Sequence, residues 1–359
     1  MAKLNRQPVW RQFPVSSPAD VLLVRYAVDQ LANSLDFSPQ RRAEAVLVAS
    51  ELAQNHVNCR TSDGNITMGG VHCGQSALLT LFSVDNGPGI EDVKKALMDG
   101  VTTGNSFGNG LGTVRRLADD FAICSDRDGN APCSFTDLHY ATRIPGTMIG
   151  ASFWWPMEPC IPPDNIRLSA IVSPMPGERF CGDGVHVIAN DHITRIVLMD
   201  ALGHGSAAAE SIIAAHQVLD LCPADEALDM VVPQLDRALT HHRGMAALFI
   251  KLHEKTGRVE TCGIGNIYGC FNDGHREFPV TSLSGVIGQN FNCRRLMVQE
   301  FCFSKEVSCV MLSDGLDESA LMTGCPNDIP PLFSSYLTFV NALSGQDDAA
   351  IIVWKWQKK

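Results

Sequence analysis

The sequence has no apolar run near the ~20 residues that a membrane-spanning helix requires, and its polar N-terminus lacks the apolar segment of a secretory signal. It contains 13 cysteines but no Cys-x-x-Cys pair and no zinc-like spacing. No basic stripe offsets the net charge of −11, which argues against a nucleic-acid partner. We therefore expect a cytoplasmic protein with reduced thiols and with neither a membrane nor a nucleic acid as a partner.

The 359 residues, 45% hydrophobic and 19% charged, are typical of an ordinary globular chain of about two to three domains. Prolines gather between residues 156 and 163, and proline this dense stops both helix continuation and sheet pairing. The sequence thus predicts a first domain at 1–155, a proline-rich linker at 156–164 and a second domain at 165–359.

Helices and strands alternate in the first half of the chain. Ser38-Pro39 is a serine cap followed by proline at the first helical position, which predicts a helix running to about Cys59. A glycine-rich loop at 100–112 precedes a short helix. The predicted strands are 66–72, 77–84, 121–125 and 147–155. This alternation is typical of an α/β sandwich.

The second half is richer in strands. Its hairpin signal lies at Asn190-Asp191, and a second strand pair turns at 255–257. Helices are expected at about 205–221 and 224–242. The predicted strands are 167–172, 185–189, 193–199, 245–253, 259–263, 307–313 and 349–354. We expect an α+β fold, a layered β-sandwich flanked by helices.

Glu51 and Asn55 stand four positions apart on the predicted helix and therefore share one of its faces. An asparagine oxygen suits a magnesium ion carried by phosphates, and a carboxylate one turn earlier could orient or deprotonate an attacking hydroxyl. The tight turn at 85–90 closes a buried strand, and the glycines at 100–112 open a helix whose bare amides suit phosphate. In this order the features predict a site for ATP with Mg²⁺.

These segments resemble the GHKL ATPase superfamily, especially its anti-sigma-factor serine kinases and the switch kinase of bacterial stress signalling. The matching segments are Ser50-Glu51-Leu52-Ala53-Gln54-Asn55, 85–90, and Gly110-Leu111-Gly112 to Phe121. The resemblance implies that Asn55 holds Mg²⁺, that Asp85 binds the adenine amino group and that Glu51 is the catalytic base. The residues it implies for the nucleotide pocket are Gly87, Gly89, Gly110, Leu111 and Gly112.

One departure from this family concerns the lid. The sigma-factor-binding members carry an arginine shortly before the lid glycines, where this chain has Gly108-Asn109. Arg115 and Arg116 lie beyond the glycines and could substitute, or could face a partner. The first domain could therefore be a serine kinase, or a non-catalytic nucleotide sensor or partner-binding module.

Four aspartates of the second half, Asp183, Asp200, Asp314 and Asp347, stand in short turn segments, three of them at the ends of strand-like runs. Carboxylates at sheet ends suit hard divalent cations, which prefer oxygen ligands. Two cations about 3.5–4 Å apart can hold a hydroxide and clamp a phosphate ester, and surrounding them takes acids from several sheet ends. The pattern predicts a two-metal hydrolytic centre in which Asp200 is well placed to bridge both ions.

The segments around these aspartates resemble the SpoIIE-type bacterial phosphatases of the protein phosphatase 2C superfamily. They are Pro176-Gly177-Glu178, Cys181-Gly182-Asp183, 199–205, Gly263-Ile264-Gly265-Asn266, 313–318 and 347–349. The resemblance implies that Asp183, Asp200, Asp314 and Asp347 bind two Mn²⁺ or Mg²⁺ ions, assisted by the carbonyl of Ala201. The implied reaction is removal of phosphate from phosphoserine or phosphothreonine.

Two details depart from this family. It usually has Asp-Gly where this chain has Asp200-Ala201, and Asp347 is adjacent to Asp348, so that the family pattern alone selects the first of the two. His204 lies beside the predicted centre in a glycine turn, where a structural role is the commoner one. No Ser-His-Asp pattern and no nucleophile elbow offers another hydrolase mechanism.

The two halves together predict a bifunctional regulator of bacterial partner switching. The first domain would phosphorylate a STAS-type antagonist protein, and the second would remove the phosphate, with a sigma-factor regulatory protein as a further candidate partner. In the first alternative the N-terminal domain is a nucleotide sensor or partner-binding module that controls the phosphatase. In the second the chain only sequesters partners, against which the intact aspartate segments argue.

Overall fold

The computed structural model describes residues 7–61, 63–98, 110–126, 146–156, 165–190, 192–289, 291–320 and 329–359. The chain divides into two compact units. The first comprises Trp10–Gly70 and Leu78–Trp155, and the second comprises Pro156–Lys359 with Val71–Ala77 and the residues up to Val9. The division into domains at 1–155 and 165–359 with a linker at 156–164 stays a prediction.

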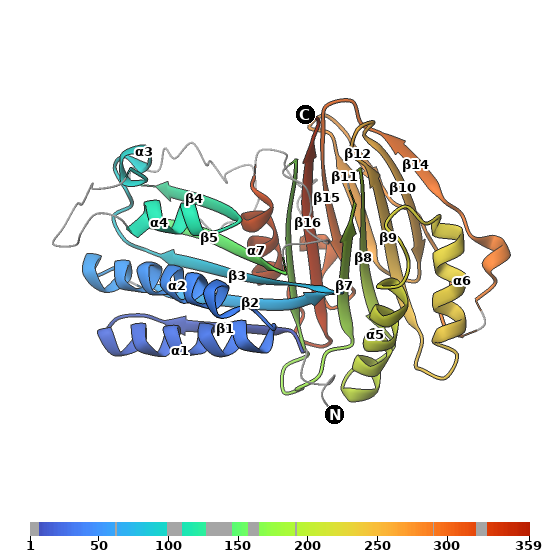
Figure 1. Ribbon diagram of the computed structural model, residues 1–359, viewed down its shortest axis with the longest axis horizontal. Coiled ribbons are helices and arrows are strands. Elements are labelled where there is room, and N and C mark those ends of the chain that lie inside the picture. Colours follow the sequence, from blue (N-terminus) through green and yellow to red (C-terminus); the bar gives the residue numbers. More distant parts are fainter. Residues whose placement is uncertain are drawn as a thin grey trace. The chain divides into compact units, whose positions relative to one another are not determined.

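The first unit is built on a five-stranded sheet with the strand order β1-β2-β3-β5-β4. The helices α1 and α2 pack side by side along it (Figure 1). Its elements are β1 (Val9–Pro14), α1 (Pro18–Ser34), α2 (Pro39–Cys59), β2 (Asn65–Cys73), β3 (Ser76–Asp85), α3 (Val93–Ala96), α4 (Gly110–Leu117), β4 (Asp120–Asp126) and β5 (Gly146–Trp155). The unit has the predicted alternation of helices and strands, and its assignment to the GHKL fold stays a prediction.

The helix α2 begins and ends where its sequence signals predict. The Ser38 hydroxyl accepts a hydrogen bond from the amide of Arg41, Pro39 occupies the first turn, and the helix ends at Arg60 in the left-handed conformation. The helix α1 was not predicted, although Ser17 and Asp20 form a capping box at its start. This signal precedes an apolar stripe in which Val24 and Val28 are fully buried.

The second unit contains two sheets. One has the order β13-β10-β9-β8-β7 with β14 paired to β10, and the other has the order β12-β11-β15-β16-β6. The strands are β6 (Ile166–Ser173), β7 (Asp183–Ala189), β8 (Ile193–Ala201), β9 (Met245–His253), β10 (Arg258–Ile264), β11 (Tyr268–Asn272), β12 (Glu277–Pro279), β13 (Ser282–Leu283), β14 (Gln299–Cys302), β15 (Glu306–Leu312) and β16 (Ala349–Gln357). The helices are α5 (Ser206–Leu219), α6 (Leu228–Ala238) and α7 (Pro331–Ala342), with 3₁₀ turns at Cys293–Arg295 and Glu318–Ala320.

Helices cover both sheets of the second unit (Figure 1). The helices α5 and α6 share one core with the first sheet, in which Ile212 and Leu235 meet Val197 and Phe249. The helix α7 packs on β6 and β16 of the other sheet. This is the layered, helix-flanked arrangement that the strand-rich sequence predicts, because each sheet buries one apolar face against the other sheet and one against helices.

Two details of the second unit differ from the expectation, and a third lies partly outside the described residues. The helix expected at 224–242 is shorter in the structure. It begins at Leu228 and ends at Ala238, after which the chain leads to β9. The helix α7 and the short strands β11 to β14 were not anticipated. Of the predicted turn at Asn190-Asp191, Asp191 lies outside the described residues; the Asn190 side chain accepts hydrogen bonds from the amides of His192 and Ile193.

None of the helices within the described ranges is long and apolar enough to cross a membrane. The ten cysteines in these ranges carry free thiols, and seven of them are buried. Most cysteines therefore pack as small apolar side chains.

Candidate functional site

The aspartates Asp183 and Asp200 are direct neighbours on one sheet. They form a register pair at the end of the antiparallel strands β7 and β8. Residues directly opposite each other in such a pair point to the same face, and like charges there repel. The sequence positions 183 and 200 are thus brought together by strand pairing.

The other sheet supplies the remaining two carboxylates. Asp314 follows β15 and Asp347 precedes β16, and these strands pair antiparallel with Leu312 opposite Ile351. The end of one strand and the start of the next therefore lie at the same edge. The charges of Asp314 and Asp347 both act on Asp200, so that the four predicted ligands gather around one position.

Burial and mutual repulsion make this cluster electrostatically unusual. Burial, followed by the charges of Asp314 and Asp347, raises the pKa of Asp200 to about 8. Burial and then the charge of Asp200 raise the pKa of Asp183, while a hydrogen bond from the Ser313 hydroxyl at 2.6 Å opposes the rise. Buried carboxylates whose pKa is raised by charged neighbours are candidates for a functional site.

The chemistry of these donors suits a hard divalent cation, whose charge would offset the repulsion among them. Two of these carboxylates, however, already accept hydrogen bonds from protein donors. Within the part of the chain that the structure describes, no group of three or more His, Cys, Asp or Glu side chains is arranged to hold a metal ion. Asp314 instead accepts a hydrogen bond from the Asn266 amide at 2.6 Å, and Asp183 accepts one from Ser313. A cation would compete with these donors for the carboxylate oxygens.

Asp348, adjacent to the predicted ligand Asp347, has a different role. Its two oxygens accept hydrogen bonds from the backbone amides of Gly182, at 2.6 Å, and Met175, at 2.7 Å, and only 3% of the residue is exposed. It therefore ties down the segment that leads into Asp183. Asp347 is less buried, and its Oδ1 accepts only the amide of Asp348, at 2.8 Å. The structure thus gives a physical reason to distinguish the two neighbours.

Ala201, which stands where the sequence departs from the phosphatase family that it resembles, fits its place in β8. The alanine lies in regular strand conformation, and its amide donates to the Gly182 carbonyl at 2.8 Å. Because the positive-φ turn falls two residues later, at Gly203, the substitution does not strain the backbone. The part of the Ala201 carbonyl as a metal ligand stays a prediction.

His204 has a partner that the sequence analysis did not identify. Its Nδ1 lies 2.9 Å from Oε1 of Glu178, and the imidazole is about half exposed, at 48%. The carboxylate of Glu178 also lies beside Gly205, at the start of α5. Only the fold brings position 178 next to position 204, so nothing in the spacing pointed to the pair.

In the first unit, Glu51, Asn55 and Gly110 come together. A Cβ at Gly110 would lie 2.9 Å from Oε2 of Glu51 and 3.9 Å from Oδ1 of Asn55. The first turn of α4 therefore packs against the face of α2 that carries both predicted residues. Gly112 is buried and Leu111 half-buried on the same helix, whereas the lid residues 99–109 lie outside the described residues.

Asp85 ends β3 and is 8% exposed. Its Oδ1 accepts the amide of Gly87 at 2.7 Å, and Gly89 two residues later has the positive φ of 71° that favours glycine. Burial raises the pKa of Asp85, opposed by the amide of Gly87 and the charge of His56. The turn thus holds a largely buried carboxyl group, whose oxygens can accept a hydrogen bond from an uncharged donor.

His56 was missed by the sequence analysis. It is 3% exposed, and its Nδ1 lies 3.9 Å from Oδ2 of Asp85. The ring bridges the Thr61 hydroxyl, at 3.0 Å, and the Ser83 hydroxyl, at 2.9 Å. It therefore braces the end of α2 against β3, and with it the strand that ends in Asp85. Its position after Asn55 carried no signal of this role.

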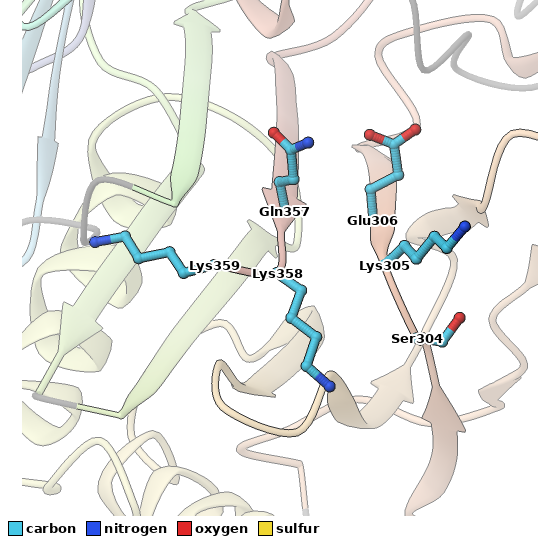
Figure 2. A pocket seen from close by; sticks show the side chains of 6 residues that line it. All are labelled: Ser304, Lys305, Glu306, Gln357, Lys358 and Lys359. Carbon is cyan, nitrogen blue, oxygen red and sulfur yellow. The ribbon is translucent and has the colours of Figure 1, made fainter.

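A cavity of about 500 Å³ lies elsewhere in the second unit. It is lined by the start of β15 and the end of β16, the opposite ends of these strands from Asp314 and Asp347. Figure 2 shows that the lining side chains of Lys305 and Lys359 point in opposite directions. Because the ammonium groups do not converge, this cavity lacks a built anion site, and the carboxylate cluster remains the better candidate.

Comparisons with known proteins found one family match and two relatives of this chain. Residues 190–328 match the family described as Stage II sporulation protein E (SpoIIE), a range that includes Asp200 and Asp314. The serine/threonine-protein kinase RsbT of Bacillus subtilis is 32% identical over 106 residues, which cover 30% of this chain and 79% of RsbT.

A second relative matches less of its own length. The phosphoserine phosphatase RsbX of Bacillus subtilis is 28% identical over 91 residues, 25% of this chain, and the match spans 45% of RsbX. A crystal structure of RsbX in complex with magnesium aligns with a TM-score of 0.48 and 20% identity, covering 55% of this chain and 99% of that one.

Proposed function

The chain belongs to the family of the serine/threonine-protein kinase RsbT, and its residues 190–328 match the SpoIIE family; on that premise we propose that it adds and removes one phosphate group on a regulatory protein. The observation that carries the phosphatase half of the proposal is the convergence of four carboxylates from two sheets around Asp200. The kinase half of the proposal rests on the proximity of Gly110, at the start of α4, to the side chains of Glu51 and Asn55 on α2.

In the second unit, Asp183, Asp200, Asp314 and Asp347 would hold two divalent cations, Mn²⁺ or Mg²⁺. When bound, such a pair supplies a hydroxide near neutral pH and clamps the phosphate for in-line attack. Ser313 and Asp348 keep Asp183 in place through the hydrogen bonds described above. His204, oriented by Glu178, is an exposed imidazole near this edge and could protonate the serine oxygen that leaves.

In the first unit, Asn55 would hold Mg²⁺ of bound ATP, and Asp85 would accept a hydrogen bond from the adenine amino group. The nucleotide pocket would be completed by Gly87, Gly89, Gly110, Leu111 and Gly112. Glu51, one turn before Asn55, would accept the proton of the protein hydroxyl that attacks the γ-phosphate. The target we propose is a serine or threonine of a STAS-type antagonist protein.

The phosphatase activity is tested by release of phosphate from a phosphoserine peptide by the full-length protein. Hydrolysis should require Mn²⁺ or Mg²⁺, stop in a chelator and disappear in Asp200→Ala. Asp317→Ala is the matched control, because Asp317 is an exposed aspartate near Asp314 whose carboxylate contacts Ser319. Full activity of Asp200→Ala, or hydrolysis without a divalent cation, would refute the two-metal proposal.

The kinase activity is tested by incubating the full-length protein with labelled ATP and a STAS-domain protein. Glu51→Ala should abolish transfer while ATP still binds. Gln54→Ala is the control on the same helix, because the Gln54 side chain donates a hydrogen bond to the exposed Asn58, at 2.9 Å. Binding of ATP without any transfer by the wild type would instead favour the alternative in which this unit is a nucleotide sensor or partner-binding module.

A further inference from the structure

Arg243 occupies a fixed position beside the carboxylate cluster. The strands β8 and β9 pair Asp200 with Ala246 and Ala201 with Met245, and the ladder continues as the Leu202 amide donates to the Gly244 carbonyl at 3.1 Å. Arg243 therefore lies just before β9, the strand that pairs with the Asp200 strand β8. The chain reaches this edge immediately before β9 begins.

The backbone of Arg243 is held from both sides. Its amide donates to the hydroxyl of Ser211 at 3.3 Å, and its carbonyl accepts the side-chain amide of Gln289 at 3.0 Å. Ser211 is fully buried on α5. Gly244, the next residue, has a φ of +77° and no space for a side chain, since a Cβ would lie 2.8 Å from the Ile287 carbonyl oxygen. These contacts fix the backbone at Arg243, and with it the position of its Cβ.

The turn after Asp200 leaves room for the guanidinium of Arg243. A Cβ at Gly203 would lie 2.5 Å from its Nη1, and Gly203 has a φ of +76°. The guanidinium makes one long hydrogen bond, from Nη1 to the Leu202 carbonyl at 3.4 Å. Within the described residues it has no acidic partner, and the side chain is exposed. A guanidinium has five N–H donors, so most of them are available to a ligand.

Arg195 shows what a structural arginine looks like in the same unit. It is fully buried, and its guanidinium donates to the carbonyls of Leu219, Cys222 and Pro223 at 2.8–3.1 Å. Arg243 has neither this burial nor this number of partners. An exposed guanidinium with a fixed base and spare donors, next to a cluster of carboxylates, is suited to a ligand that carries negative charge.

We propose that Arg243 binds the phosphate group of the phosphoserine substrate. The proposal rests on the proposed phosphatase function and adds the residue that selects a doubly charged phosphate monoester. A phosphate dianion approaching this edge would meet four carboxylates, and the guanidinium of Arg243 would add positive charge there beyond that of the metal ions. The planar fork of arginine matches two phosphate oxygens at once, which a lysine ammonium cannot do.

The experiment compares Arg243→Ala and Arg243→Lys with Arg237→Ala in the full-length protein with Mn²⁺. Arg237 is the matched control, because it is an exposed arginine of the same unit whose guanidine also contacts one backbone carbonyl, that of Pro233 at 3.2 Å. We measure KM and kcat for a phosphoserine peptide and the inhibition constant of inorganic phosphate. Thermal unfolding of each variant reports whether the turn remains folded.

Arg243→Ala should raise KM and the inhibition constant of phosphate about 10-fold or more, the size expected for one charge-assisted hydrogen-bonded contact, with a much smaller change in kcat. Arg243→Lys should recover part of both. Arg237→Ala should leave both constants unchanged. An arginine that only supports the turn would change thermal stability without changing the phosphate constant, and that result would overturn the proposal.

Direct binding of inorganic phosphate to the Mn²⁺-loaded protein separates this proposal from the proposed function. If the wild type hydrolyses no phosphoserine peptide, the phosphatase proposal fails, and calorimetry with phosphate still decides the role of Arg243. Binding that is lost in Arg243→Ala supports the assignment. Equal binding by both proteins, or no binding by the wild type, refutes it.

Discussion

The two candidate sites are assembled in different ways. In the first unit, Glu51 and Asn55 share one helix face through their spacing, and Gly110 and Asp85 approach from other elements. In the second unit, four carboxylates come from two sheets, and burial together with the charges of their neighbours raises the pKa of both Asp183 and Asp200. The first site can therefore form with little electrostatic cost, whereas the second is under repulsion that the rest of the fold must withstand. The following predictions test this difference.

The largest expected effect separates the neighbours Asp347 and Asp348. Asp347→Asn should lower phosphoserine hydrolysis by about 10³-fold while leaving thermal stability unchanged, because it removes a proposed metal ligand. Asp348→Asn should lower the free energy of unfolding by about 2–3 kcal/mol, because an amide nitrogen would replace one acceptor of the Gly182 and Met175 amides. Steady-state kinetics and chemical denaturation measure both. The reverse pattern would show that the ligand is Asp348.

The next effect concerns how α4 is held against α2. Arg41, 8% exposed, donates to the Leu117 carbonyl at 3.0 Å, pairs with Glu44 and Asp119, and lies over the ring of Phe153. Arg41→Met should lower the free energy of unfolding of the first unit by about 3 kcal/mol, because it leaves buried partners without their cation.

The adjacent Arg42 is the control for this substitution. It pairs with Asp29 in a more exposed position, at 2.7 Å. Arg42→Met should therefore cost less than about 1 kcal/mol in urea unfolding. Equal costs would mean that Arg41 does not hold the two helices together, and that the first site depends on α2 alone.

A smaller effect is expected for ATP affinity. Asn55→Ala should weaken ATP binding in the presence of Mg²⁺ by about 30-fold, because it removes the proposed protein ligand of the ATP-bound Mg²⁺. Phosphoserine hydrolysis should stay unchanged. Calorimetry measures the affinity. Asn58→Ala is the control, since Asn58 is exposed one turn later on the same helix. Equal affinities for both variants would place the nucleotide elsewhere.

The smallest effect is a pH dependence within the second unit. Burial lowers the pKa of His186 below its usual 6.5, opposed by its hydrogen bond to Asp220 and reinforced by the charge of Arg195. The folded protein therefore keeps His186 neutral while the unfolded chain takes up a proton, and stability falls as the pH drops below about 6.5. Urea midpoints at about pH 7.5 and about pH 5.5 should differ more for the wild type than for His186→Gln. An equal difference would exclude His186 as the cause.

Much of the secondary structure followed from local signals. The helix Pro39–Cys59 and the strand Met245–His253 have the predicted bounds, because a cap with proline and a continuous apolar run are unambiguous. The short strands β11 to β14 escaped prediction because they are few residues long and only partly buried, so their side chains show no clear alternation. The helix α7 is buried on most of its surface and lacks an amphipathic pattern.

The sequence by itself determined the candidate site residues, since aspartates in short turn segments and an Asn-bearing helix are recognisable from residue type and order; their roles stay predictions. Only the tertiary structure decided which partners the side chains at these sites have. Asp348 accepts hydrogen bonds from the amides of Met175 and Gly182, and His204 contacts Glu178. Arg243, which the sequence did not single out, makes one long hydrogen bond within the described residues. The physical reason is that these contacts join positions far apart in the chain. Burial and electrostatic coupling depend on distances in space, which residue order does not encode.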